Sequence, residues 1–170
     1  MNIHPFFVHF PIALLTLYGV MEIVWSKVLK RELWWLNSKA LLLTCGVLGG
    51  FAALQTGEIA EGLRERGSQL IETHSFYATV SVWIFVALLV GYIVFYVEKY
   101  TASSEEQSFI KKITTVLKPI GRLIMWGAPV LACVGIITLI ITGALGGAIV
   151  YGPDTDPIVH FVYNAFVGLQ

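Results

Sequence analysis

The chain has 170 residues, of which 56% are hydrophobic and 13% are charged, and its formal net charge is zero. Soluble globular domains carry roughly 25% charged residues. A chain with a mean hydropathy of +0.76 is too apolar to hide its surface in a core of its own, so lipid is the expected solvent. The neutral charge balance also argues against a nucleic-acid partner.

Four apolar segments reach the roughly 20-residue length that an α-helix needs to cross a bilayer. They cover residues 5–28, 39–56, 73–97 and 123–151. The sequence therefore predicts an all-α fold, an integral membrane four-helix bundle formed by a single domain over residues 1–170. No basic leader precedes the first segment and no small-residue cleavage site follows it, so we expect this segment to remain in the protein.

Two shorter helices are expected at the membrane surface. Ser103 and Glu106 have capping-box spacing, and the apolar residues that follow recur with helical periodicity. These are Phe109, Ile110, Ile113, Val116 and Leu117. The pattern is typical of an amphipathic helix lying on the membrane. In the tail, Asp156 can cap a helix that starts with Pro157. Residues 157–169 are too short to span, so we expect a helix there that lies at the interface or folds back into the bundle.

Basic residues gather at the end of the predicted bundle where the first segment finishes. This end holds nine of the eleven Lys and Arg residues: Lys27, Lys30, Arg31, Lys39, Lys99, Lys111, Lys112, Lys118 and Arg122. The opposite end holds Arg64 and Arg66. The positive-inside rule places the basic end in the cytoplasm. We therefore expect a multi-pass membrane protein with both termini on the outer side of the membrane.

All four histidines lie at the outer end of the predicted bundle. His4 and His9 open the first span, His74 opens the third, and His160 follows the fourth. Ionisable groups are costly inside a membrane and usually mark function there, and a neutral imidazole is a common ligand of metals and haem iron. His9 is the strongest candidate because it lies about one turn inside the apolar run.

The leading hypothesis is a membrane b-type cytochrome-like module that transfers electrons and binds one or two haem b groups near the outer face. His9 and His74 are the expected axial ligands. His4 and His160 form a second pair or supporting groups, and pairing His4 with His74 is an alternative.

Glycines and aromatic residues could complete such a site. Two G-x-L-G-G runs, at residues 46–50 and 143–147, contain Gly50 and Gly147, which could border a slot for the flat macrocycle. Apolar walls would come from Phe6, Phe7, Phe10, Phe76 and Tyr77. The competing interpretation is that glycines at four-residue spacing only let helices pack closely.

Two other hypotheses stay open. One is a cofactor-free structural subunit of a larger respiratory or photosynthetic membrane complex, to which the glycine faces and the apolar tail would contribute. The other is a copper- or zinc-binding membrane protein that uses the same four histidines. Zinc prefers four ligands at short local spacings, and the separation of His4 from His9 does not put both on one helical face. The histidines could also simply hydrogen-bond water and headgroups at the interface.

The sequence contains no nucleotide-binding loop and no G-x-S-x-G, H-E-x-x-H or C-x-x-C-H motif. A hydrolase or kinase is therefore not expected, and a non-catalytic electron-transfer or accessory subunit fits better than an enzyme. Expected partners are the lipid bilayer, another redox protein or membrane-complex subunit, and further copies of this chain. Near the basic end, Glu22 and Glu98 could pair with Lys27 or Lys99, and we assign them no chemistry.

The opening His4-Pro5-x-x-Val8-His9-Phe10-Pro11-Ile12-Ala13-Leu14 resembles the signature of a bacterial membrane-protein family known as domain of unknown function 2231. Thr56-Gly57, His74 and the run Thr142-Gly143-x-x-Gly146-Gly147-x-x-Val150-Tyr151 resemble the same family. The resemblance implies a four-helix inner-membrane protein whose relatives occur near or fused to electron-transfer domains. The tail beyond Tyr151 departs from the family pattern. The histidines that open the first and third helices are also similar to those of small membrane b-type cytochromes, by architectural analogy.

Overall fold

The computed structural model describes residues 4–24, 32–62, 69–101 and 108–168, with side chains for 7–24, 32–60, 69–99 and 115–168. In this part the chain forms α1 (His4–Ile23), α2 (Leu33–Gly62), α3 (Gln69–Thr101), α4 (Ser108–Tyr151) and α5 (Pro157–Tyr163), and then a π-helical turn η2 (Asn164–Gly168). No strand occurs among the described residues, so the all-α prediction is confirmed.

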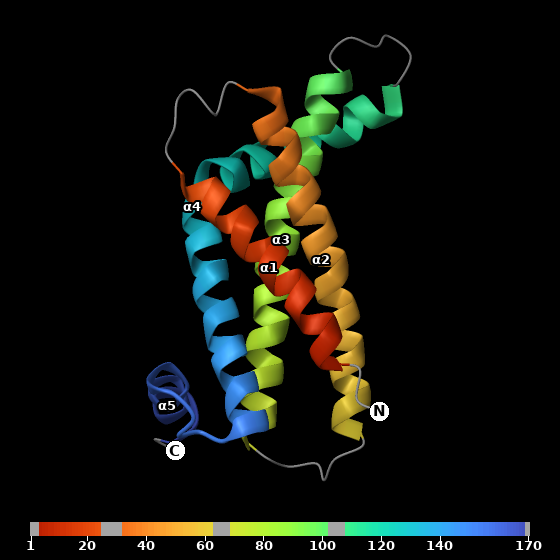
Figure 1. Ribbon diagram of the computed structural model, residues 1–170. Coiled ribbons are helices and arrows are strands. Elements are labelled where there is room, and N and C mark those ends of the chain that lie inside the picture. Colours follow the sequence, from red (N-terminus) through yellow and green to blue (C-terminus); the bar gives the residue numbers. More distant parts are fainter. Residues whose placement is uncertain (1–3, 25–31, 63–68, 102–107, 169–170) are drawn as a thin grey trace.

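The long helices α2, α3 and α4 run alternately up and down, and α1 crosses them obliquely (Figure 1). Among the described residues, three helical stretches are long and apolar enough to cross a membrane: Leu33–Ala60, Gln69–Lys99 and Thr115–Tyr151. The predicted count of four spans is thus not matched. The apolar part of α1, Phe7–Ile23, is shorter. At 1.5 Å per residue it covers about 26 Å, slightly less than the roughly 30 Å hydrocarbon core.

The predicted surface helix is not a separate element, because its residues from Ser108 onward are the first turns of α4. Those turns cross the upper end of the bundle before the helix turns downward (Figure 1). Pro119 lies inside α4, and a helix-interior proline lacks an N–H donor and favours a bend. The predicted capping residues Ser103 and Glu106 lie outside the described residues.

Two apolar clusters hold the bundle together. The larger one joins α1, α2, α3 and α4 through buried side chains, among them Leu15, Leu43, Phe85 and Ala128. The smaller one packs the tail against the lower end of α4. Its buried members are Ala144, Leu145, Ala148, Val159, Val162 and Val167. The predicted interfacial helix therefore forms as α5 and is anchored to the bundle by its apolar face.

A buried ion pair ties α1 to α2 and α3. The Nζ atom of Lys39 donates to Oε2 of Glu22 at 2.8 Å, and the two side chains are each only 7% exposed. The hydroxyl of Tyr92 donates to the same carboxylate oxygen at 2.7 Å. Lys39 lies nearly two turns inside α2 and was not among the partners expected from the sequence. Of those, Lys27 lies outside the described residues.

Glu98, by contrast, forms an exposed pair at the end of α3. Its carboxylate contacts Nζ of Lys118 and, at 3.5 Å, the guanidinium of Arg122, both from α4. Lys99, one of the two partners expected from the sequence, does not take part in this pair. An exposed ion pair contributes little to stability because water already solvates both charges.

Removing one charge of the buried pair should destabilise the bundle far more than removing one charge of the exposed pair. Glu22→Gln or Lys39→Met should each lower the free energy of unfolding by about 3–5 kcal/mol, because the remaining charge stays buried without its partner. The double variant should lose less than the sum. Reversible unfolding in mixed micelles, followed by circular dichroism, measures this, with Glu98→Gln as the matched control. Equal small losses for Glu22→Gln and Glu98→Gln would contradict it.

Candidate functional site

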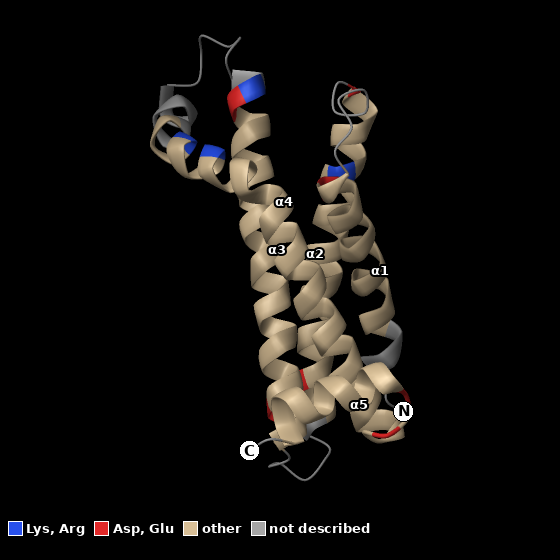
Figure 2. Ribbon diagram, turned by 90° about the vertical axis from the view of Figure 1, so that its left-hand side faces the viewer, with Lys and Arg blue, Asp and Glu red and all other residues tan. Residues whose placement is uncertain are grey.

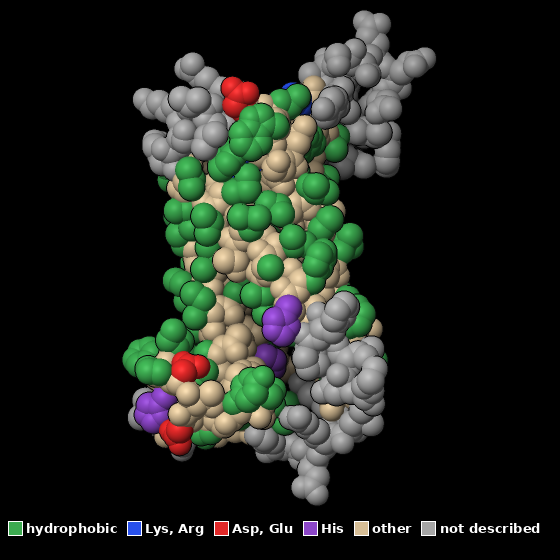
Figure 3. Space-filling model, in the orientation of Figure 1, with side chains coloured by type: hydrophobic (Ala, Val, Ile, Leu, Met, Phe, Trp, Pro, Cys, Tyr) green, Lys and Arg blue, Asp and Glu red, His purple; other side chains and the backbone are tan. Residues whose placement is uncertain are grey.

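The described basic side chains and the described histidines lie at opposite ends of the bundle. Described Lys and Arg side chains lie at the upper end, where α2 begins and α3 ends, whereas acidic residues occur at both ends (Figure 2). The histidine side chains gather at the lower end (Figure 3). His9 and His74 lie in the second turns of α1 and α3, and His160 is on α5. The described histidines therefore share one end, as predicted.

His74 is held against α4 by a hydrogen bond to the backbone. Its Nδ1 lies 3.0 Å from the carbonyl oxygen of Thr142. A carbonyl can only accept, so Nδ1 carries the proton and donates, and Nε2 is the basic nitrogen of the ring. Metal- and haem-binding histidines commonly have this arrangement, in which one ring nitrogen is oriented by a carbonyl or carboxylate.

A glycine makes room for this imidazole. A Cβ atom added to Gly146 would lie 3.2 Å from Cε1 of His74 and 3.6 Å from its Nδ1. In a helix the carbonyl of residue 142 points toward residue 146, so the missing side chain leaves that oxygen accessible to a second donor. The sequence showed Gly146 only as part of a family motif. In the structure its role is to leave room for the imidazole of His74.

The polar contact continues into the interface of α3 and α4. The hydroxyl of Thr142 donates to the carbonyl of Thr138 at 2.8 Å and lies 3.5 Å from Oγ of Ser81. Ser81, Thr138 and Thr142 are all buried. These residues were not predicted as part of the site. Ser81 and Thr142 could have been predicted from the sequence, because each places a hydroxyl group at a similar depth in one of two apolar segments.

His9 lies in an apolar groove between α1 and α2. The groove has a volume of about 660 Å³ and is lined by Phe7, His9, Phe10, Gly49 and Ala52. Phe7 and Phe10 are two of the aromatic walls predicted from the sequence. Cavities of this size accept small-molecule ligands.

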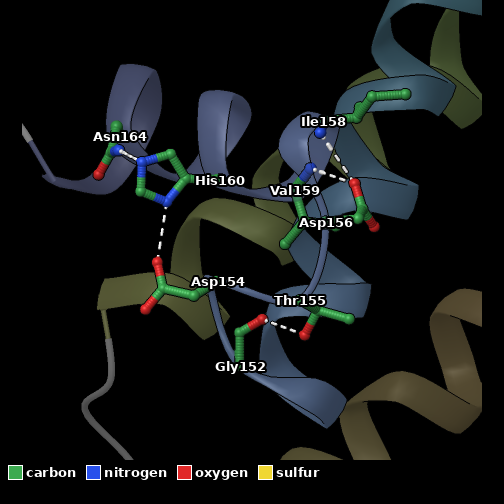
Figure 4. Close-up of polar contacts among 8 residues, drawn as sticks. All are labelled: Gly152, Asp154, Thr155, Asp156, Ile158, Val159, His160 and Asn164. Atoms are coloured by element: carbon green, nitrogen blue, oxygen red, sulfur yellow. Dashed lines mark hydrogen bonds and ion pairs between the residues drawn. The ribbon is translucent and has the colours of Figure 1, made fainter.

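His160 belongs to a local cluster in the tail (Figure 4). Its Nδ1 lies 2.8 Å from Oδ1 of Asp154, and the side-chain amide of Asn164 lies 2.8 Å from its Nε2. The amide Nδ2 can only donate, so Nε2 accepts and Nδ1 donates to the carboxylate. Both ring nitrogens are engaged within the tail. Asp156 caps α5 by accepting from the N–H groups of Ile158 and Val159 at 2.8 and 2.9 Å, as predicted.

The remaining predicted site residues are a histidine and two glycines. His4 is the first residue of α1, and its side chain lies outside those described. A Cβ on Gly50 would lie 3.0 Å from Val82 of α3, and one on Gly147 would lie 3.3 Å from Val159 of α5. Both glycines therefore permit close helix packing, and their role at a cofactor stays a prediction. Among the described side chains, no group of three or more His, Cys, Asp or Glu residues could hold a metal ion.

Comparison with known proteins gives one family match. A family model described as "Predicted membrane protein (DUF2231)" matches residues 1–155. No curated protein matches the chain, and no solved structure matches it. The matched region contains α1 to α4 with His9, His74 and Gly146, and it ends before α5.

The two glycine runs allow a paired test of packing. Gly50→Leu should destabilise the bundle by about 1–3 kcal/mol, because Val82 is buried and cannot move aside. Gly143→Leu should leave stability unchanged or slightly raised, because a Cβ there meets nothing within 4 Å. The stability of both variants is measured by unfolding in micelles, and their haem content is measured by absorption in the same preparations. Loss of pigment from Gly50→Leu at unchanged stability would contradict the packing assignment and favour a cofactor slot.

Proposed function

We propose that this chain, which belongs to the DUF2231 family of predicted membrane proteins, is a membrane b-type cytochrome-like electron-transfer module. Haem b would be held by the imidazoles of His74 and His9. When bound, it would supply reversible one-electron chemistry. The observation that carries the proposal is the oriented imidazole of His74.

The residues around His74 fit an axial ligand. Donation from Nδ1 to the carbonyl of Thr142 selects the tautomer whose lone pair is on Nε2. The same bond restricts rotation of the ring and raises the basicity of Nε2. Gly146 lets the ring lie close to α4. These features orient a ligand before any cofactor arrives, which lowers the entropic cost of binding.

His9 supports the proposal through its surroundings. Its groove is bordered by two phenylalanines and two small residues, so a flat apolar ring could lie against α2 at Gly49 and Ala52. Low dielectric surroundings also tune the reduction potential of a bound haem. His4 and His160 are not needed for a single haem, although His4 is a further candidate at the same end.

The second candidate function is a structural subunit of a larger membrane complex. Helix packing at Gly46, Gly50 and Gly147 favours it, since a Cβ at each would lie within 3.3 Å of a neighbouring apolar side chain. A copper or zinc site is a third candidate and would need His4 to join the described histidines. The spectrum of the purified protein separates the first candidate from the others, and elemental analysis separates the last two.

The location that we propose is the inner membrane of a bacterium, with the histidine end on the periplasmic side and the basic end in the cytoplasm. Lys39, Lys118 and Arg122 all lie near the upper end, which supports this orientation through the positive-inside rule. Electron exchange would then take place with a redox protein or complex subunit at the outer face.

The protein purified from haem-replete cells should show a Soret band that shifts on reduction. His74→Ala and His9→Ala should remove this band, because each variant lacks one axial imidazole. His160→Ala should retain it, since both nitrogens of that ring are engaged in the tail. Absorption spectra and pyridine haemochrome analysis measure the pigment, and circular dichroism verifies folding. A full Soret band in both His9→Ala and His74→Ala would refute the assignment.

The orientation can be tested separately from the cofactor. Alkaline phosphatase fused after Gly62, at the lower end of α2, should be active, because this enzyme matures only in the periplasm. The same fusion after Thr101, at the upper end of α3, should be inactive. The reverse pattern of activity would overturn the proposed topology. It would not bear on haem binding, which the absorption spectrum tests separately.

A further inference from the structure

A second pocket lies beside the tail, apart from His9 and His74. It has a volume of about 390 Å³ and is lined by Glu72, Thr73, Phe76, Tyr77, Ala165 and Phe166. The first four residues come from the beginning of α3, and the last two come from η2. The pocket therefore exists only because the tail folds back onto α3.

Aromatic rings form a corner in this pocket. The ring of Tyr77 lies 5.4 Å from that of Phe76 and 5.2 Å from that of Phe166, with interplanar angles of 82° and 73°. Rings in edge-to-face contact present their faces in different directions. Perpendicular aromatic walls are the arrangement by which proteins enclose the ammonium group of a ligand, because each ring face carries partial negative charge.

The acidic group of the pocket pairs with no cation among the described residues. Glu72 is exposed in the first turn of α3 and has no hydrogen-bond or ion-pair partner among the residues that the structure describes. The described Lys and Arg side chains lie at the opposite end of the bundle (Figure 2). Within the part of the chain that the structure describes, this exposed carboxylate is therefore available to a cationic ligand.

Packing and hydrogen bonds within the tail fix the position of Phe166. The π-helical turn η2 presents Phe166 to Tyr77 while its neighbour Val167 is buried in the cluster on α4. Single π-helical turns are uncommon and frequently occur at functional sites. The hydrogen bond from Asn164 to His160 joins the start of this turn to α5. The aromatic wall from the tail is thus fixed by packing and polar contacts.

We propose that this pocket binds an ammonium group, with Glu72 supplying the counter-charge and Phe76, Tyr77 and Phe166 supplying the aromatic walls. The group could belong to a free organic cation or to an ammonium-bearing lipid headgroup, which share the same chemistry. The proposal is independent of haem binding, since neither His9 nor His74 lines the pocket.

The experiment compares choline with its uncharged isostere 3,3-dimethylbutanol on full-length protein in maltoside detergent, using isothermal titration calorimetry. Choline should bind at least about tenfold more tightly, because the isostere fills the same space but lacks the cation–π and carboxylate interactions. Glu72→Gln and Phe166→Leu should each weaken choline binding by about three- to tenfold. Matched controls are Glu58→Gln, an exposed acid at the end of α2, and Phe161→Leu, an exposed aromatic of α5 outside the pocket.

Competition by dihexanoylphosphatidylcholine identifies the source. Displacement of choline supports the pocket as a headgroup site, and failure to displace it supports a site for a free cation. Glu72 is exposed, so Glu72→Gln should fold even if Phe166→Leu does not. Equal affinities for choline and the isostere, or unchanged choline affinity in Glu72→Gln, would overturn the proposal.

Discussion

The Glu22–Lys39 pair is the constraint that fixes the position of α1. Two opposite charges buried in an apolar bundle are tolerated only when they meet in one geometry. Glu22 comes from α1, Lys39 from α2, and the hydroxyl of Tyr92 from α3. The apolar length of α1 is marginal for a span, so packing and this pair, rather than bilayer thickness, set how deep the helix sits. The position of His9, about four turns away on the same helix, follows from that depth.

Glycines allow the close contacts in the lower half of the bundle. At Gly49 a Cβ would lie 3.2 Å from Phe10, and at Gly146 a Cβ would meet the His74 imidazole. The same type of residue therefore brings α1 close to α2 and gives His74 access to a backbone carbonyl of α4. Helix packing at Gly49 and the positioning of His74 at Gly146 therefore have the same cause, because both need a helix backbone that can be approached closely.

The elements of this fold could be predicted from the sequence because they depend on local patterns. Apolar length located α2, α3 and α4, and the Asp156-Pro157 pair located the start of α5. The tertiary partners could not be predicted, because no periodicity distinguishes Lys39 from the other lysines near the basic end. The prediction placed the surface segment in a separate helix, since the break at Pro119 looks the same in sequence whether the chain stops or only bends.

The candidate site divides in the same way. The positions of His9 and His74 at one end follow from counting spans, and the structure agrees. The roles of Thr142 and Gly146 depend on the rotation of α4 about its axis, which the sequence alone does not determine. Likewise, nothing in the apolar run of the tail indicates that Phe166 would reach Tyr77, because that contact requires the wide turn of η2.

The continuity of α4 has a mechanical consequence. A single 44-residue helix carries the segment that crosses the upper end of the bundle at one end and the carbonyl that orients His74 near the other. Helices are stiff along their axis, so a pull on the surface segment would travel down α4 and shift the imidazole that rests on it. Pro119 and Pro129 each interrupt the backbone ladder of this helix. At these two positions α4 is therefore expected to bend more easily than along the rest of its length.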